Sequence, residues 1–365
     1  MTPAFTVHLD DVEPWRDSYV AVGMLETDAG PAARIFSSPD GLNWTVAYDP
    51  GTDHWPRHLV ARDDELLAFS QRDSFPEVSP GSIVGAPPDT YIWRSTDGVH
   101  WSLLGDWPTI PVGSRSAGWD ETQYPIHPGL IDVASGPGGG LVAIGNTFAG
   151  DKLAPSLLYS PDGVTWAVEH LPDAPSPILN AIVATDGGYV VVGAVDIGPD
   201  PATAVPAAWH SADGVTWTRA TVEEHPDAIA RGEFGRLEAG MAGLVTCFDS
   251  REMKAGGWRF DDPWISADGS NWRRVGTSDP DHPRIACGWM DGDGERIIAI
   301  GARQAPTGQP WPGVTEAWSS FDGVTWTPLT LSDVLTDSFE AFWVVPDGVI
   351  YAGVQSFWFG TALMR

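Results

Sequence analysis

A seven-residue phrase recurs six times along the 365 residues, and it restricts the fold more than any other feature of the sequence. Every copy has Ser at its first position, Asp-Gly at its third and fourth positions and Trp at its seventh position. The six copies, called boxes below and numbered in chain order, occupy residues 38–44, 95–101, 160–166, 211–217, 266–272 and 320–326. Their Asp residues stand 57, 65, 51, 55 and 54 residues apart, a spacing that predicts a tandem array of similar supersecondary units.

The chemistry of the box is that of a tight turn. An Asp carboxylate accepts hydrogen bonds from nearby backbone N–H groups, and Gly adopts a positive φ at little cost. The Ser hydroxyl adds a further turn hydrogen bond, and the Trp begins the returning strand. Each box therefore predicts a hairpin whose Trp enters the core.

The box resembles the Asp-box, or BNR repeat, whose usual form has one more residue between Asp and Gly. In that family the motif marks the turn between the third and fourth strands of β-propeller blades, in sialidases, some glycoside hydrolases and sortilin-type receptors. The resemblance spans nearly the whole chain, and it implies a structural box that lies away from a catalytic mouth. Sialidase activity is not expected, because the nearest fragment to the Phe-Arg-Ile-Pro motif of sialidases is Pro-Arg-Ile at residues 283–285, in the sixth unit.

Before each box, short apolar segments alternate with turn residues. In the third unit these are residues 130–135, 141–145 and 156–160, and residues 167–171 follow the box. The pattern predicts a four-stranded antiparallel meander, and no segment has a sustained helical period. The second strand is recognisable seven times, at residues 19–23, 66–70, 141–145, 189–193, 244–248, 297–301 and 349–353. We therefore predict an all-β fold, a single-domain seven-bladed β-propeller.

The expected blades cover about residues 5–50, 57–106, 128–172, 178–223, 233–277, 283–331 and 338–365. The seventh unit has no box, so its fourth strand comes from the N-terminal residues 1–4 or is missing. Closure by the N-terminal residues would remove the open edges that a sheet must otherwise protect.

The charge balance excludes two classes of partner. The chain has 49 acidic and 20 basic side chains and a formal net charge of −29. Such a surface repels phosphate backbones and anionic lipids, so we expect no nucleic-acid or membrane partner, and a monomer. No stretch is apolar enough to span a bilayer, and the first residues do not resemble a signal peptide. The protein is expected to be extracellular if a leader has been removed and cytoplasmic otherwise.

The two cysteines, Cys247 and Cys287, are too few for a disulfide framework. They fall on strands of successive units and could meet, but two buried thiols are the favoured interpretation. No cofactor is expected. His54, His127, His225 and His282 recur in the connections between blades, but not at equivalent places, so a transition metal is disfavoured.

Function is expected on the face opposite the boxes, where residues 71–90, 106–129, 249–263 and 302–316 form long loops that differ from one another. Aromatic side chains beside carboxylates and Arg suit a sugar, which stacks its C–H face on an indole and hydrogen-bonds its hydroxyls. A second polar set, which also includes His8, marks the starts of the innermost strands. The candidate substrate-binding residues are His58, Trp119, Tyr124, Asn180, Arg236, Trp258, Arg284 and Trp311.

Two functions remain open. In the first, a single site at the loop-rich mouth acts on a carbohydrate or similar polar small molecule by hydrolysis or elimination, because the boxes repeat whereas the loops do not. The candidate acids and bases are Glu121, His127, Asp132 and Glu340. In the second, the same face binds a glycan, peptide or protein without catalysis.

Overall fold

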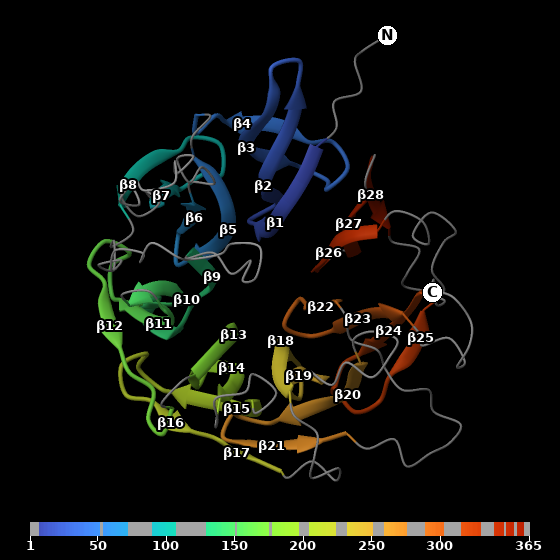
Figure 1. Ribbon diagram of the computed structural model, residues 1–365. Coiled ribbons are helices and arrows are strands. Elements are labelled where there is room, and N and C mark those ends of the chain that lie inside the picture. The colour runs from blue at the N-terminus through green and yellow to red at the C-terminus, as the bar shows by residue number, and fades with distance from the viewer. Residues whose placement is uncertain are drawn as a thin grey trace, which may run out of the picture. The chain divides into compact units, whose positions relative to one another are not determined.

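The computed structural model describes residues 7–51, 54–71, 90–106, 129–149, 152–174, 177–196, 204–223, 232–250, 259–275, 289–302, 315–329, 339–346, 348–353 and 356–360 (Figure 1). These residues are all-β apart from one short 3₁₀ turn, η1 (Pro137–Gly139). The chain divides into two compact units: unit 1 is residues 1–170 with 354–357, and unit 2 is residues 171–353 with 358–365.

Unit 1 contains three four-stranded antiparallel meanders. The first is β1 (Val7–Trp15), β2 (Ser18–Thr27), β3 (Gly30–Ser38) and β4 (Thr45–Tyr48). The second is β5 (Trp55–Arg62), β6 (Glu65–Gln71), β7 (Thr90–Ser95) and β8 (Ser102–Asp106). The third is β9 (Gly129–Ser135), β10 (Leu141–Ala149), β11 (Lys152–Ser160) and β12 (Ala167–Glu169). The first strands of successive sheets, β1, β5 and β9, contact one another, as the blades of a propeller do.

Unit 2 continues the series with three more such sheets. The fourth is β13 (Pro177–Thr185), β14 (Gly188–Asp196), β15 (Ala204–Ser211) and β16 (Thr218–Arg219). The fifth is β18 (Gly232–Gly240), β19 (Gly243–Ser250), β20 (Arg259–Ser266) and β21 (Asn271–Arg274). The short strand β17 (Thr221–Val222) pairs in parallel with β21, an addition that the sequence pattern did not predict. The sixth is β22 (Trp289–Gly292), β23 (Ile297–Ala302), β24 (Thr315–Ser320) and β25 (Thr327–Leu329).

The prediction of seven blades is wrong. The described residues form six complete blades, and the last sheet has only three strands: β26 (Phe339–Val345), β27 (Gly348–Gly353) and β28 (Ser356–Gly360). All seven predicted second strands exist, but counting them overestimates the blades, because the seventh unit lacks a box and therefore the turn into a fourth strand. Residues 1–4, the suggested source of that strand, lie outside the described residues.

The boxes form the turn between the third and fourth strands of each complete blade. In all six, the Asp Oδ1 accepts the N–H of the residue two positions later, and the Trp Nε1 donates to the Gly carbonyl. The box glycines have φ between 68° and 82°. This is the left-handed region that favours Gly, which explains its place in every box.

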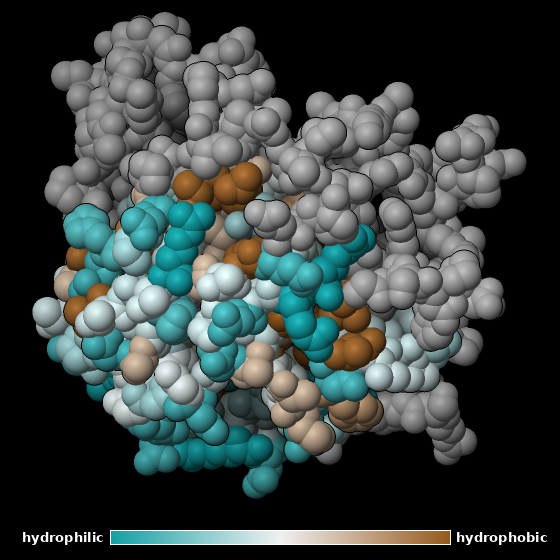
Figure 2. All heavy atoms as spheres, turned by 90° about the horizontal axis from the view of Figure 1, so that it is seen from below, coloured by the Kyte–Doolittle hydropathy of each residue, from teal (hydrophilic) through white to brown (hydrophobic). Residues whose placement is uncertain are grey.

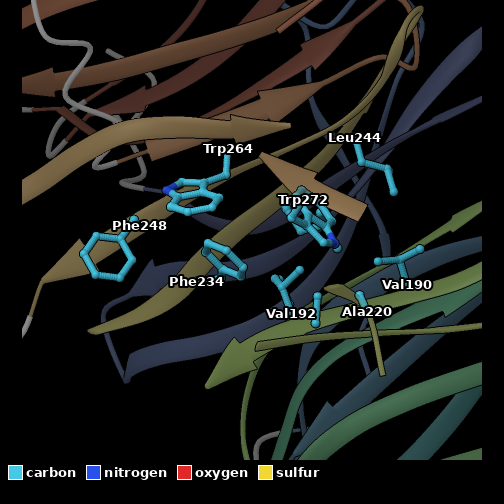
Figure 3. Packing of buried hydrophobic residues seen from close by; sticks show 11 residues of the cluster. Val190, Val192, Ala220, Phe234, Leu244, Phe248, Trp264 and Trp272 are labelled. Carbon is cyan, nitrogen blue, oxygen red and sulfur yellow. The ribbon is translucent and has the colours of Figure 1, made fainter. Parts of the chain in front are cut away.

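Boxes also join successive blades. A Cβ on Gly269 would lie 2.4 Å from Val190 Cγ2, and one on Gly323 would lie 2.4 Å from Val245 Cγ2, so the fifth and sixth boxes rest on the second strand of the preceding blade. Trp272 of the fifth box is buried with Phe234, 5.8 Å between ring centroids (Figure 3). Trp101 and Trp217 are buried as well, whereas the Trp residues of the first, third and sixth boxes are half-buried, so the predicted burial of the box Trp holds fully for three of the six.

Cys247 on β19 is buried and disulfide-bonded, so the prediction of a free thiol there is wrong. Its Sγ lies 3.9 Å from Met290 Sδ on the next blade. Cys287, the other cysteine of the sequence, lies outside the described residues.

Hydrophilic residues cover much of the described surface in the face shown in Figure 2, and apolar residues there form separate groups. Among the residues that the structure describes, no helix has the length and apolar character that crossing a membrane requires.

Candidate functional site

The innermost strand of nearly every blade is interrupted by a β-bulge. In β1, β5, β9 and β13, one residue is left without a partner on the second strand: Asp10, Arg57, Ile131 and Asn180 respectively. The bulge brings the two backbones together, because a Cβ on Gly23 would lie 2.0 Å from His8 O and one on Gly193 would lie 1.9 Å from Ile178 O. The Gly within β2, β10 and β14, at residues 23, 145 and 193, pairs beside the bulge and is its signature in the sequence. Bulges are frequent on strands next to functional sites.

The residue that follows the bulge is polar in every blade of unit 1. It is Asp11 on β1, His58 on β5 and Asp132 on β9, each at the same register against the second strand. Because β1, β5 and β9 contact one another in order, the fold brings these three positions together. We call Asp11, His58 and Asp132, with Asp10, Trp55 and Arg57 beside them, the bulge site.

Asp11 connects two blades. Its Oδ1 accepts the N–H of Val12 and its Oδ2 accepts the N–H of Leu59 on β5, both at 2.8 Å. Burial raises the pKa of the Asp11 carboxyl to about 7. The two backbone hydrogen bonds oppose this rise, whereas the negative charges of Asp132 and Asp10 add to it. A carboxyl that holds its proton near neutral pH beside a second carboxylate can act as a general acid.

His58 stays neutral. Burial lowers its pKa to about 4, and the positive charge of Arg57 contributes to the shift. An imidazole that is neutral at pH 7 has one N–H donor and one acceptor nitrogen, so it can orient a polar group without adding charge.

The indole of Trp55 lies next to Asp10 and Arg57. Trp55 Nε1 donates to Asp10 Oδ2 at 2.8 Å, and the Arg57 guanidinium lies 5.0 Å from the centroid of the Trp55 ring. Arg57 Nη1 is 4.0 Å from Asp10 Oδ1. The indole is half-buried and held from two sides, an arrangement that fixes its orientation.

Asp132 is the predicted catalytic residue that the structure places in this site. It is half-buried, and its Oδ1 accepts the N–H of Val133 at 2.8 Å, as the Oδ1 of Asp11 does from Val12. His58 is the predicted substrate-binding residue that joins it. His8 lies on β1 and is half-buried.

The predicted residues of unit 2 do not form an equivalent set. Asn180 donates its Nδ2 to Phe234 O at 2.8 Å and so joins β13 to β18. The Arg236 side chain is exposed, and Glu340 occupies a bulge on β26. The positions after the bulges are Ala181, Leu237 and Ala341, which cannot titrate.

Most loop candidates cannot be placed. Glu121, His127, Trp119, Tyr124, Trp258, Arg284 and Trp311 lie outside the described residues. Of the connection histidines, His54 is described, and its ring packs edge-on against Tyr91 at 4.2 Å, which is a structural role. Within the described ranges, no three His, Cys, Asp or Glu side chains gather in a way that could hold a metal ion.

Four residues of the bulge site were missed by sequence reasoning: Asp10, Asp11, Trp55 and Arg57. The available signal was the Asp-Asp pair on the first strand, opposite a second strand that contains Gly23. Only the register of β1 on β2 shows that the bulge places Asp11 in line with His58 and Asp132.

The blades place the chain in the all-β β-propeller class. No family model matches the sequence, and no curated protein matches it. Similar solved structures include the sialidase of Trypanosoma rangeli, at 14% identity over 88% of this chain and 53% of that one, with a TM-score of 0.40. The chain therefore spans about half the length of that sialidase.

Two further structures are similar to the chain. The phage phi92 endosialidase matches at 13% identity over 95% of this chain and 62% of that one, with a TM-score of 0.41. The β-propeller domain of the Trilobed protease from Pyrococcus furiosus matches at 10% identity over 84% and 81%, with a TM-score of 0.46. A fold does not determine an activity, so the function has to be argued from the site.

Proposed function

We propose that this protein acts on a carbohydrate or similar polar small molecule at the bulge site, by hydrolysis or elimination. The observation that supports this most is the shared register of Asp11, His58 and Asp132 on three contacting strands. Two carboxyl groups and a neutral imidazole in one place are the groups that acid–base chemistry on a polar substrate needs.

The roles follow from the environments of the two carboxyl groups. Asp11, whose pKa burial raises to about 7, is the proton donor. Asp132 is the second carboxylate, which acts as a base or stabilises positive charge that develops on the substrate. His58 orients a hydroxyl, and the Trp55 indole offers an apolar face beside it.

A second function is favoured by one observation. In unit 2, Asp291 on β22 accepts the N–H of Val344 on β26, a bridge between blades of the same kind as that from Asp11 to Leu59. Asp11 therefore has an architectural role as well, and a propeller in which it has only that role would bind a glycan, peptide or protein without turnover.

Asp291 provides the matched control that separates the two functions. We expect Asp11→Asn and Asp291→Asn to lower the melting temperature by similar amounts, because each leaves a backbone N–H facing an amide. Asp11→Asn and Asp132→Asn should lower turnover by about 100-fold or more, the effect of losing a general acid or base, whereas Asp291→Asn should leave turnover unchanged. The assay is a panel of oligosaccharides scored for both binding and cleavage.

If a glycan binds and is never cleaved, or if Asp291→Asn reduces turnover as much as Asp11→Asn, the catalytic proposal fails. The pH profile gives a second readout. The acidic form of Asp11 is the active one, so kcat should fall as the pH rises through about 7, and this limb should be absent in Asp11→Asn.

Compartment is a separate part of the proposal. The disulfide at Cys247 supports an oxidising environment, because disulfides are rare in cytosolic proteins. We propose that the protein works outside the cytoplasm.

A further inference from the structure

A groove of about 480 Å³ opens between the fifth and sixth boxes, in unit 2. Its polar lining includes Asp268, Asn271 and Arg273 from the fifth blade and Asp322 from the sixth box. Leu244, Ile265 and Val324 supply apolar lining. The groove belongs to a different unit from the bulge site, and its size is that of pockets that hold small ligands.

The fifth box differs from the other five in sequence and in hydrogen bonding. It has Ser270-Asn271 where three other boxes have Val-Thr. In the five boxes other than the fifth, the residue three positions after the Asp donates its N–H to the Asp Oδ1, at 2.6 to 2.8 Å. In the fifth box, Ser270 supplies the hydrogen bonds from its N–H and hydroxyl, and Asn271 donates its Nδ2 to Ser270 Oγ at 2.8 Å.

The fifth strand of this blade explains the difference. Strand β17 pairs with Asn271 and Trp272, and Thr221 donates its N–H to Ser270 O at 2.8 Å. The backbone at Asn271 therefore follows a strand rather than the turn. Asn271 is exposed and lines the groove, and its Nδ2 donates to Ser270 Oγ within the box.

Arg273 is the second unusual group. Its side chain is exposed on β21 and forms no hydrogen bond or ion pair with the described part of the chain, although two carboxylates line the same groove. Hydrogen bonds from Ser270 keep the pKa of Asp268 below its ordinary value. Burial acts to raise the pKa of Asp322, but the N–H groups of Thr325 and Val324 outweigh it. Both groups are therefore acceptors at neutral pH.

The lining defines the ligand. Carboxylates accept hydrogen bonds, a guanidinium donates them, and a side-chain amide does both. Hydroxyl groups satisfy all three, whereas an anion would face Asp268 and Asp322, and a cation would face Arg273. The apolar residues suit the C–H face of a sugar ring. We propose that the groove between the fifth and sixth boxes binds a neutral sugar unit, independently of the bulge site.

The test uses the full chain and immobilised oligomers of glucose, galactose and mannose, followed by calorimetry on any oligomer that is retained. Ser270→Val with Asn271→Thr restores the common box sequence and should weaken binding at least 10-fold. Arg273→Ala removes an exposed side chain that has no partner among the described residues, and it should also weaken binding at least 10-fold, with an unchanged melting temperature.

The fourth box supplies the matched control, because Val215→Ser with Thr216→Asn gives it the fifth-box residues away from the groove. This variant, and Asp11→Asn in the bulge site, should bind as the original chain does. The proposal is overturned if none of the oligomers binds, if Arg273→Ala binds normally, if Asp11→Asn abolishes binding, or if free amino acids displace the sugar at equal concentration.

Discussion

Units 1 and 2 are built from the same blade, yet they differ at one position of the innermost strand. After the bulge, unit 1 has Asp11, His58 and Asp132, whereas unit 2 has Ala181, Leu237 and Ala341. The bulge itself is therefore a property of the scaffold. At the described positions directly after a bulge, titratable side chains occur in unit 1 and not in unit 2.

Unit 2 departs from the common blade elsewhere. Strand β17 covers the outer edge of its fifth blade, and Cys247 carries a disulfide. The outer strands β4, β8 and β12 of unit 1 have exposed apolar residues at Val46, Leu103 and Val168. The matching residues of unit 2 are Arg219, Arg274 and Pro328. Charge at Arg219 and Pro at Pro328 discourage unwanted pairing of the edge strands β16 and β25, whereas Arg274 lies on β21, which β17 covers.

The strongest test of the shared scaffold is the glycine opposite the bulge. Gly23→Ala in unit 1 and Gly193→Ala in unit 2 each drive a Cβ to about 2 Å from a backbone oxygen, which no side-chain movement relieves. We expect each to cost more than about 4 kcal/mol or to prevent folding, which is the range of exceptional single mutations. Soluble yield and thermal unfolding measure this.

Gly105→Ala is the control, because a Cβ there meets nothing within 4 Å and its φ is not positive. Its free energy of unfolding should lie within about 0.5 kcal/mol of that of the original protein, as for most surface substitutions. Normal folding of Gly23→Ala alone would show that the bulges of the two units are not equivalent, and the comparison would then lose its basis.

The repetitive part of the fold was accessible from the sequence because it depends on local chemistry. Asp-Gly forms a tight turn wherever it stands between two strands, so the boxes and the second strands followed from composition and spacing. The three-stranded last sheet could not be predicted in the same way, because the number of second strands does not show whether a blade has a fourth strand. The parallel strand β17 has only two residues, and no periodicity can show so short an element.

The site was less accessible, for a reason that the bulges make clear. A bulge shifts the alternation of inward and outward side chains by one residue, so a strand pattern read from the sequence selects the wrong neighbour. On β1, the sequence pattern indicated His8 as the polar residue of the site, whereas the register places Asp11 directly after the bulge. The sequence also gave no reason to expect that Asn180 would hydrogen-bond to the next blade.

The disulfide at Cys247 provides a test of whether the two units differ in stability. Cys247→Ser should lower the stability of unit 2 by about 3 kcal/mol, the usual contribution of a native disulfide, and should leave unit 1 unchanged. Hydrogen exchange measured by peptide separates the units. Reducing the original protein should reproduce the effect, whereas Cys247→Ser should not respond to reductant. Equal changes in both units would mean that they unfold as one, and no response to reductant would contradict the bond.

The smallest effect expected is a pair of opposite pH dependences confined to unit 1. The pKa of Asp11 is about 7 in the folded protein and 3.8 in the unfolded chain, so between these pH values the folded state binds a proton that the unfolded state has lost. Its contribution to stability is present below about pH 4 and is lost as the pH rises through 7. His58 has a folded pKa of about 4 against 6.5, so its contribution is present above pH 6.5 and is lost as the pH falls toward 4.

Between pH 4 and 6.5 the two dependences oppose each other, and the original protein should change little there. Asp11→Asn exposes the His58 dependence, so stability should fall on acidification, whereas His58→Gln exposes the Asp11 dependence, so stability should fall as the pH rises. Each slope is at most about 1.4 kcal/mol per pH unit and smaller here, because both side chains are partly exposed to solvent. Denaturant unfolding of each variant across this range measures the slopes. The double variant should lose both dependences, and slopes of the same sign in the two single variants would contradict the opposite pKa shifts of Asp11 and His58.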